Sequence, residues 1–435
     1  MKKDGFTMNK VAKRLLNTIS ASTSPIHCVI ESKRQLKEAG FTELPLADEW
    51  VLERGKGYYI DLYDSSFMAF RVNEGFEVGQ GFRFAHAHTD FCGLRIKGNP
   101  EINEGVYKKL NVEVYGGPIL NTWFDRPLSV AGKVAVRSED VFAPKIIMID
   151  FKRPILTIPN LAIHLNRNVN SGVEINNQVD ILPLLGMAGE EVNESEFMDA
   201  LAKEAGVSRE EILDFELGVY CFEEGTEVGL NNEFISSPRI DNISSVQACL
   251  TALINGTRRE GIDVIGCFDH EEVGSRSKKG ADSQLLGILL EKIYRTLGGS
   301  KMQYDNALLK SNCLSVDVAH AIHPNKKEKS DITNKVYLNK GVAIKIACAQ
   351  SYATDTAMVG MVVGLCEKAN VPYQKFYNRS DVKGGSTLGA IINAILPIPT
   401  QDIGIPLLAM HSTRETMGVK DQEYLEQLLT SYFSL

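Results

Sequence analysis

From about residue 236 to the C-terminus, short apolar runs alternate with longer stretches in which apolar residues recur at helical spacing. The runs predicted to be strands are IDVIGCFD, NCLSVDV, GVAIKIA and GIPLLAM. The stretches predicted to be helices are ISSVQACLTALING, SQLLGILLEKIYRTL, TDTAMVGMVVGLCEKA, STLGAIINAI and QEYLEQLLTSYF. Alternation of this kind is typical of an α/β domain with a mainly parallel sheet flanked by helices.

The N-terminal part of the chain shows a helical pattern of apolar residues, followed by patterns typical of strands. Residues 8–40 are predicted to be helical, because Val11, Leu15, Leu16 and Ile19 fall on one helical face. Three predicted strands follow, in GKGYYIDLY, SSFMAFRV and GFRFAHAHTD.

Residues 93–235 have a different pattern. They are rich in Gly, Asn and Pro and contain short β-type stretches such as LNVEVYGG, AGKVAVRS and APKIIMID, with one helical stretch near 194–214. We therefore predict an inserted β-rich domain over 93–235, which interrupts an α/β domain made of residues 1–92 and 236–435. A chain of 435 residues is long enough for two or three domains.

Composition and the absence of certain sequence signals argue against several classes of protein. The formal net charge is −8, which argues against a general nucleic-acid-binding protein. No run of apolar residues is long enough for a transmembrane helix. The charged start MKKDGFTMNKVAKRLL lacks the apolar core of a secretory signal, so we expect a cytoplasmic protein. The eight cysteines form no CxxC pair and are expected to be reduced thiols.

Residues able to bind a metal ion lie at or after the ends of predicted strands. His88 ends the run AHAH, and His411 follows LLAM. Acidic residues follow other apolar segments: Asp241, Glu271, Glu272 and Asp317. Ligands of open α/β sheets bind beyond the carboxyl ends of the strands, so we expect these segments to meet in one crevice.

This set of residues suits a hydrolase with two metal ions. Zinc accepts imidazole nitrogen and carboxylate oxygen, and one carboxylate is able to bridge two ions. Of the neighbours Glu271 and Glu272, one suits a metal ligand and the other a base for the attacking water. Each residue also has a purely structural interpretation. A histidine at the end of a strand is often a buried structural residue, Glu271 and Glu272 suit a solvated loop, and Asp241 suits a turn. His320 and His323 are further candidates that suit supporting or core roles equally well.

Together, several motifs resemble the aspartyl aminopeptidase and aminopeptidase I family of dinuclear zinc exopeptidases, from about residue 10 to the C-terminus. The matching segments are AHAHTD, NTWFDRPLSVAGKV, NLAIHLNR, SSPRIDN, FDHEEVGS, SVDVAHAIHPN, SYATD, GGSTLGAI and MHSTRET. The order in which they occur is specific, although each one alone is weak.

The resemblance implies a role for each matched position. His88 and Asp317 are expected to bind one metal ion, Glu272 and His411 the other, and Asp241 to bridge the two. The ions are expected to be zinc, with cobalt or manganese as substitutes.

The remaining roles concern catalysis and substrate. Glu271 is implied as general base and acid, and Asp90 as the group that orients His88. His164 is implied to reach the active site of a neighbouring subunit, although its run PNLAIHLNR also suits a buried strand. Lys345 matches a lysine that contacts acidic substrate side chains, but the segment after it, IACAQS, has lost the polar groups usual in such members. The preference for acidic or neutral N-terminal residues therefore stays open. Lys345 has the alternative that its stem packs while its ammonium reaches solvent or a protein carboxylate.

At the level of the whole protein, the resemblance implies an α/β peptidase domain interrupted by a dimerisation domain. It further implies dimers assembled into a tetrahedral dodecamer that cleaves peptides with a free N-terminus. The alternatives are another dinuclear hydrolase on the same fold, such as a deacylase or carboxypeptidase, and a binding or scaffold protein with a dead site. The complete set of candidate ligands argues against the dead site.

Overall fold

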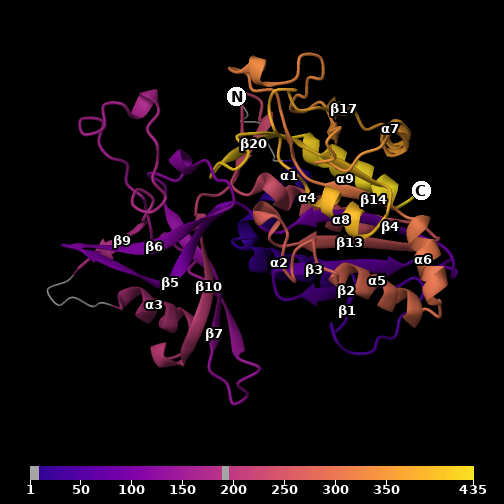
Figure 1. The fold of residues 1–435 in the computed structure, drawn as a ribbon, viewed down its shortest axis with the longest axis horizontal. Coiled ribbons are helices and arrows are strands. Elements are labelled where there is room, and N and C mark those ends of the chain that lie inside the picture. The colour runs from indigo at the N-terminus through magenta and orange to yellow at the C-terminus, as the bar shows by residue number, and fades with distance from the viewer. Residues whose placement is uncertain (1–8, 189–194) are drawn as a thin grey trace, which may run out of the picture. The chain divides into compact units, whose positions relative to one another are not determined.

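The chain divides into two units in the computed structural model, which describes residues 9–188 and 195–435 (Figure 1). The first unit contains residues up to Asp90, Gly225–Met410 and Glu415–Leu435, and the second contains Phe91–Glu224 and His411–Arg414. The breaks in the structure thus fall at 90/91 and 224/225, where the sequence predicted 92/93 and 235/236. Residues 225–235 belong to the first unit because they enter one of its sheets, and the short segment 411–414 belongs to the second unit.

A nine-stranded mixed sheet forms the centre of the first unit. In spatial order its strands are β1 (Thr42–Glu43), β2 (Gly57–Leu62), β3 (Ser66–Val72), β13 (Ile262–Phe268), β4 (Phe82–His88), β14 (Asn312–Val316), β18 (Thr400–Gly404), β16 (Val342–Lys345) and β17 (Tyr373–Phe376). The central strands β13, β4, β14 and β18 run parallel to one another. The predicted α/β class with a mainly parallel sheet is confirmed.

The helices of this unit cover the sheet. They are α1 (Lys10–Ala21), α2 (Pro25–Glu38), α4 (Ile240–Asn255), α5 (Leu285–Thr296), α6 (Lys301–Leu309), α7 (Thr356–Ala369), α8 (Leu388–Ile395) and α9 (Asp421–Tyr432). Helices α5, α6 and α8 share a hydrophobic core with the strands, and α4 packs against β4 and β13. Every residue of β13 is buried, as expected for a parallel strand with both faces covered.

The helical stretch predicted over 8–40 is two helices. Ser24 accepts a hydrogen bond from the His27 N–H, and Pro25 occupies the first turn of α2. Serine before a proline at the first helical position is a strong start signal, so a new helix begins there. Residue 8 lies outside the described residues.

The first unit contains a second sheet. Its five strands, in spatial order, are β11 (Thr226–Val228), β12 (Phe234–Ser237), β20 (Glu415–Gly418), β19 (Pro406–Leu408) and β15 (Ala319–His320).

The second unit is built on a six-stranded antiparallel sheet. Its strands, in spatial order, are β8 (Lys145–Asp150), β7 (Leu128–Val136), β10 (Ile212–Cys221), β5 (Gly93–Glu104), β6 (Tyr107–Tyr115) and β9 (Leu184–Met187). Helix α3 (Glu196–Ala205) buries Phe197 and Leu201 in the core of this unit. The predicted helix over 194–214 is shorter than expected: Gly206 ends α3 in the left-handed conformation, and residues from Ile212 onward form β10. Residue 194 lies outside the described residues.

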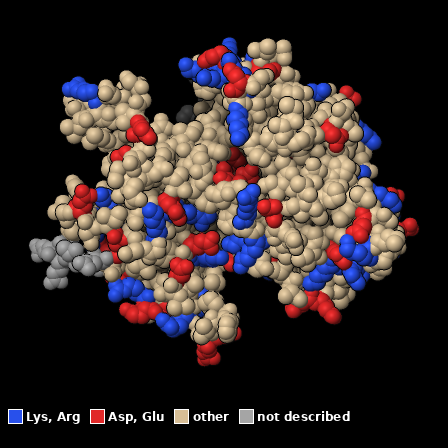
Figure 2. All heavy atoms as spheres, in the orientation of Figure 1, with Lys and Arg blue, Asp and Glu red and all other residues tan. Residues whose placement is uncertain are grey.

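Charged side chains of both signs are interspersed over the face shown in Figure 2. Within residues 9–188 and 195–435, no helix is long and apolar enough to cross a membrane.

Candidate metal site

Four candidate residues lie at the carboxyl ends of neighbouring parallel strands. His88 is the last residue of β4, and Asp317 follows the last residue of β14. Glu271 and Glu272 begin a short 3₁₀ turn, η4 (Glu271–Val273), after β13. Because β13, β4 and β14 are adjacent, their ends meet at one edge of the sheet. The tertiary structure therefore brings together residues that are far apart in the sequence.

Three carboxylates converge on one ring nitrogen of His88. From His88 Nε2, the distance to Asp241 Oδ1 is 3.4 Å, to Asp317 Oδ1 3.6 Å and to Glu271 Oε2 3.9 Å. Ligand atoms of His88, Asp241 and Asp317 all lie within 4.8 Å of one another, and the three residues are buried.

The other ring nitrogen of His88 fixes its tautomer. His88 Nδ1 lies 3.0 Å from the backbone oxygen of Asp90. A carbonyl oxygen only accepts hydrogen bonds, so Nδ1 must carry a proton and donate it. In a neutral imidazole this leaves the lone pair on Nε2, the nitrogen that faces the three carboxylates.

Asp90 also holds the turn that carries the two glutamates. Its carboxylate accepts the backbone N–H of Glu271 at 3.1 Å and that of Glu272 at 3.2 Å. His270 precedes them in a left-handed conformation, with φ 67°. Asp90 is fully buried, and this one residue positions the end of β4 through its backbone oxygen and η4 through its carboxylate.

Asp241 lies at the start of α4, but its backbone is not helical. Its φ and ψ are −75° and 105°, and its peptide bond to Asn242 is cis. The Asp241 N–H donates to Glu415 Oε2 at 2.9 Å, and Asn242 Nδ2 donates to the Val316 oxygen at 2.9 Å. These bonds attach the irregular segment to β20 and to the end of β14. The turn that the sequence predicted at Asp241 is therefore also what directs the Asp241 carboxylate at His88.

Lys345 contacts groups of the protein itself. Its ammonium donates to Asp317 Oδ2 at 3.3 Å and to the Val318 oxygen at 2.9 Å, and lies 4.6 Å from the ring centre of Tyr352. The side chain is buried, at the end of β16. This geometry matches the alternative in which Lys345 pairs with a protein carboxylate.

The charges of the cluster shift its protonation equilibria. Burial lowers the pKa of His88, but the negative charge of Glu271 and the hydrogen-bonding carboxylates outweigh burial and raise this pKa well above its ordinary value. Burial raises the pKa of Glu271 well above its ordinary value, and neighbouring carboxylates add to that shift. Burial would also raise the pKa of Asp317, but the charge of Lys345 and the His88 hydrogen bond lower it overall. The surroundings of Nε2 are therefore strongly negative and favour a cation.

The donors of this cluster fit zinc. Imidazole nitrogen and carboxylate oxygen are zinc ligands, and Asp90 supplies the hydrogen bond that a ligating histidine needs at its other nitrogen. His88, Asp241 and Asp317 are the residues that would hold the ion.

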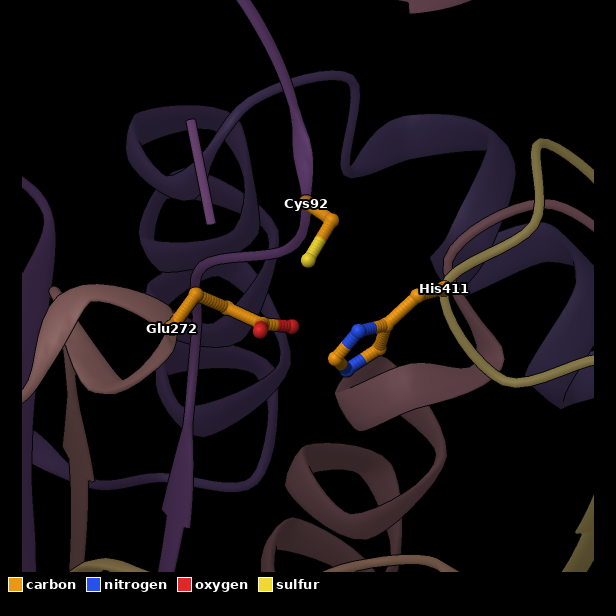
Figure 3. A group of neighbouring side chains, drawn as sticks. All are labelled: Cys92, Glu272 and His411. Carbon is orange, nitrogen blue, oxygen red and sulfur yellow. The ribbon is translucent and has the colours of Figure 1, made fainter. Parts of the chain in front are cut away.

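His411 belongs to the second unit and has similar support. Its Nδ1 lies 3.0 Å from the Gly117 oxygen, so this nitrogen also donates and the lone pair falls on Nε2. Its ring lies beside the Cys92 thiol, with ligand atoms within 4.8 Å (Figure 3). Glu272, the other residue drawn there, belongs to the first unit.

The other candidate histidines lie elsewhere. His164 is exposed in a turn of the second unit, so the buried strand considered for PNLAIHLNR is wrong. His320 on β15 packs its ring against Phe376, and His323 Nδ1 accepts the Asn325 N–H. His320 and His323 line a cavity of about 250 Å³.

Sequence reasoning missed several supporting residues. Glu415 holds the Asp241 backbone, Tyr352 lies against the Lys345 ammonium, and Gly117 and Cys92 flank His411. Glu415 is inside the motif MHSTRET, but nothing in its spacing indicated a contact with Asp241. Cys92 follows AHAHTD by two residues and was counted only among the thiols.

An α/β sheet that gathers histidine and carboxylates at the ends of its parallel strands is typical of metal-dependent hydrolases. The sequence model of the aminopeptidase I zinc metalloprotease family (M18) matches residues 18–433. The chain therefore belongs to the M18 family, which is described as a family of zinc metalloproteases, and is a metallo-aminopeptidase, as the motifs predicted.

Similar proteins support this assignment over the whole chain. A probable M18 family aminopeptidase 2 of Clostridium novyi is 47% identical over 428 residues, which is 98% of this chain and 99% of the relative. The protein of the same description from Clostridium acetobutylicum is 46% identical over 426 residues, 98% of each chain.

Solved structures agree with the fold. Ape4 in its complex with Nbr1 superposes with a TM-score of 0.93 at 34% identity, covering 97% of this chain and 85% of Ape4. The M18 aminopeptidase of Thermotoga maritima has a TM-score of 0.87 at 23% identity, covering 99% and 98% of the two chains.

Proposed function

We propose that this aminopeptidase hydrolyses peptides with a free N-terminus at a site of two divalent metal ions. His88 and Asp317 bind one ion, Glu272 and His411 bind the other, and Asp241 bridges them. The observation that carries the proposal is the convergence of three carboxylates on His88 Nε2 while Asp90 holds Nδ1. The family description supports zinc, and cobalt or manganese are expected to substitute.

Bound zinc supplies Lewis acidity, which acidifies water and polarises a carbonyl group. The chain's own residues prepare this chemistry. Glu271 places its carboxylate beside the proposed ligands, where it is able to accept a proton and return it to the leaving amine. Asp90 positions Glu271 and Glu272 through their backbone N–H groups.

The second metal position is proposed at Glu272 and His411. Its support is the match of both residues to the family motifs and the Nε2 lone pair that Gly117 imposes on His411. Lys345, proposed from the motifs as a substrate-binding residue, has contacts that support a second role, that of holding Asp317 in place.

We further propose that the enzyme forms dimers through the inserted unit and assembles into a tetrahedral dodecamer. One solved structure with a TM-score of 0.83 at 22% identity is described as the dodecamer of S. cerevesiae mApe1. The exposed position of His164 supports its proposed role at a neighbouring subunit's site.

None of the eight cysteines forms a disulfide, which supports the proposed cytoplasmic location.

Metal content and substrate choice test the core of this proposal. The purified enzyme should contain two equivalents of metal per chain by elemental mass spectrometry. Exhaustive chelation should abolish hydrolysis of a dipeptide, and added zinc, cobalt or manganese should restore it. The N-acetylated form of the same dipeptide should resist cleavage; its hydrolysis at a comparable rate would indicate a deacylase or carboxypeptidase instead. Full activity in protein shown to contain no metal would overturn the proposal.

A further inference from the structure

The Cys92 thiol lies beside a proposed metal ligand. Its sulfur and a ring nitrogen of His411 lie within 4.8 Å of each other, and both residues belong to the second unit (Figure 3). Six of the eight cysteines are buried, Cys348 is exposed, and Cys92 is partly exposed. Among the cysteines, therefore, Cys92 combines access with a neighbouring ligand.

The backbone of this unit brings the two side chains together. Cys92 immediately precedes β5, and Gly117 follows β6 by two residues. Gly93 pairs with Tyr115 in the antiparallel ladder, so Cys92 lies opposite the Gly116–Gly117 turn. The His411 oxygen accepts the Ile119 N–H at 2.9 Å, and Thr413 bonds to Thr122, which anchors residues 411–414 to the same turn.

A single glycine orients both donor atoms. The Gly117 N–H donates to Cys92 Sγ at 3.2 Å, and the Gly117 oxygen accepts from His411 Nδ1 at 3.0 Å. The first bond suits a thiolate, which needs donors to its sulfur, and the second exposes the Nε2 lone pair. Supporting bonds of these kinds are what metal-bound cysteine and histidine use.

We infer that Cys92 is a further ligand of the metal ion that His411 binds, and that its sulfur makes this position selective for zinc over manganese. This inference rests on the proposed two-metal function. Zinc binds sulfur at about 2.3 Å and imidazole nitrogen at about 2.0 Å, so two such atoms on one ion lie roughly 3.5 Å apart. In the structure the Cys92 sulfur and the His411 ring nitrogen lie within 4.8 Å of each other. On binding, the thiol releases its proton to solvent and the sulfur donates an electron pair to the ion.

The chemical consequence is a difference between the two metal positions. His88, Asp241 and Asp317 offer only nitrogen and oxygen, which suit manganese as well as zinc. A thiolate is a soft ligand that favours zinc and disfavours manganese. The position at His411 is therefore the one at which the choice of metal is made.

Cobalt spectroscopy tests the ligand directly, because cobalt bound to a thiolate shows an intense near-ultraviolet charge-transfer band that nitrogen and oxygen ligands do not produce. The metal-free full-length enzyme is titrated with Co²⁺ alone, as are Cys92→Ser and the control Cys348→Ser. The band should appear in the wild type and in Cys348→Ser and be missing in Cys92→Ser, while weaker visible bands of bound cobalt persist in all three. Visible bands without the charge-transfer band in the wild type would overturn the inference but leave the metal site standing. If the wild type binds no cobalt at all, the proposed metal site fails as well.

Competition between metals provides the second measurement. Loss of a ligand should weaken zinc binding by more than the roughly 10–100-fold typical of losing a group that only supports a ligand. Cys92→Ser should therefore lose zinc affinity by that margin at one of two positions, with manganese affinity little changed. Equal effects on both metals would show that Cys92 acts only in packing. Circular dichroism and subunit size, measured on each variant, separate either result from misfolding.

Discussion

Lys345 and Asp317 form a buried ion pair in which the ammonium nitrogen lies 3.3 Å from Asp317 Oδ2. The same aspartate presents Oδ1 at 3.6 Å from His88 Nε2. Lys345 therefore acts on one oxygen of a proposed metal ligand and leaves the other oxygen directed at the histidine.

Lys345→Met is expected to impair the enzyme for every substrate. The change leaves Asp317 buried without its cation, and breaking a buried pair from one side costs about 3–5 kcal/mol. Denaturant unfolding should show that loss, and turnover of Asp-, Glu- and Leu-starting dipeptides should fall by similar factors. The exposed Lys375→Met serves as control. A selective loss for acidic substrates would instead assign Lys345 to substrate recognition.

Glu271→Gln should reduce turnover by about 10²–10⁴-fold, the usual contribution of a general base. The amide keeps the shape of the side chain but is unable to accept the proton. Metal content should stay at the wild-type value, since Glu271 is not among the proposed ligands. Glu260→Gln, an exposed change, controls for the substitution itself. Near-normal turnover would mean that the base lies elsewhere, with Asp90 examined next.

His164→Ala should lose about 10²–10³-fold in turnover, as expected for the loss of one donor to the developing oxyanion, while it keeps both metal ions. If His164 serves a neighbouring subunit, mixing His164→Ala with Glu271→Gln subunits should restore part of the activity. Some mixed sites then combine an intact Glu271 with an intact His164. Demonstrated subunit exchange without recovered activity would restrict His164 to its own chain.

Asp421 predicts a pH-dependent part of the folding stability. Burial raises the pKa of Asp421 to about 7 from the ordinary 3.8, although backbone N–H groups of Asn339, Gly341 and Gly418 oppose the shift. Between those two pH values the folded state binds the proton and the unfolded state does not, so stability falls as pH rises through this window. Asp421→Asn should flatten that part of the curve. Urea unfolding at steps between pH 4.5 and 7.5 measures it, with exposed Asp48→Asn as control; an unchanged slope in Asp421→Asn would refute the assignment.

Apolar periodicity was sufficient to locate most elements of the first unit. It failed at β18, whose sequence TQDIG contains Gln401 and Asp402, both buried. These side chains bond to distant parts of the chain: Gln401 Nε2 donates to the Lys345 oxygen, and Asp402 Oδ2 accepts the Ala353 N–H. A buried strand that relies on distant hydrogen-bond partners has no local hydrophobic signature.

The sequence by itself determined the family, most of the strands and helices of the first unit, and the set of candidate ligands, because each of these depends on local pattern or on motifs in order. Only the tertiary structure decided how they meet. It showed that Asp90 holds both His88 and the turn of Glu271 and Glu272, and that Lys345 is paired with Asp317. It also placed 411–414 with the second unit, beside Cys92. Apart from the contact between His88 and Asp90, these relationships join residues tens to hundreds of positions apart, and they arise from sheet order and backbone hydrogen bonding, which no local pattern records.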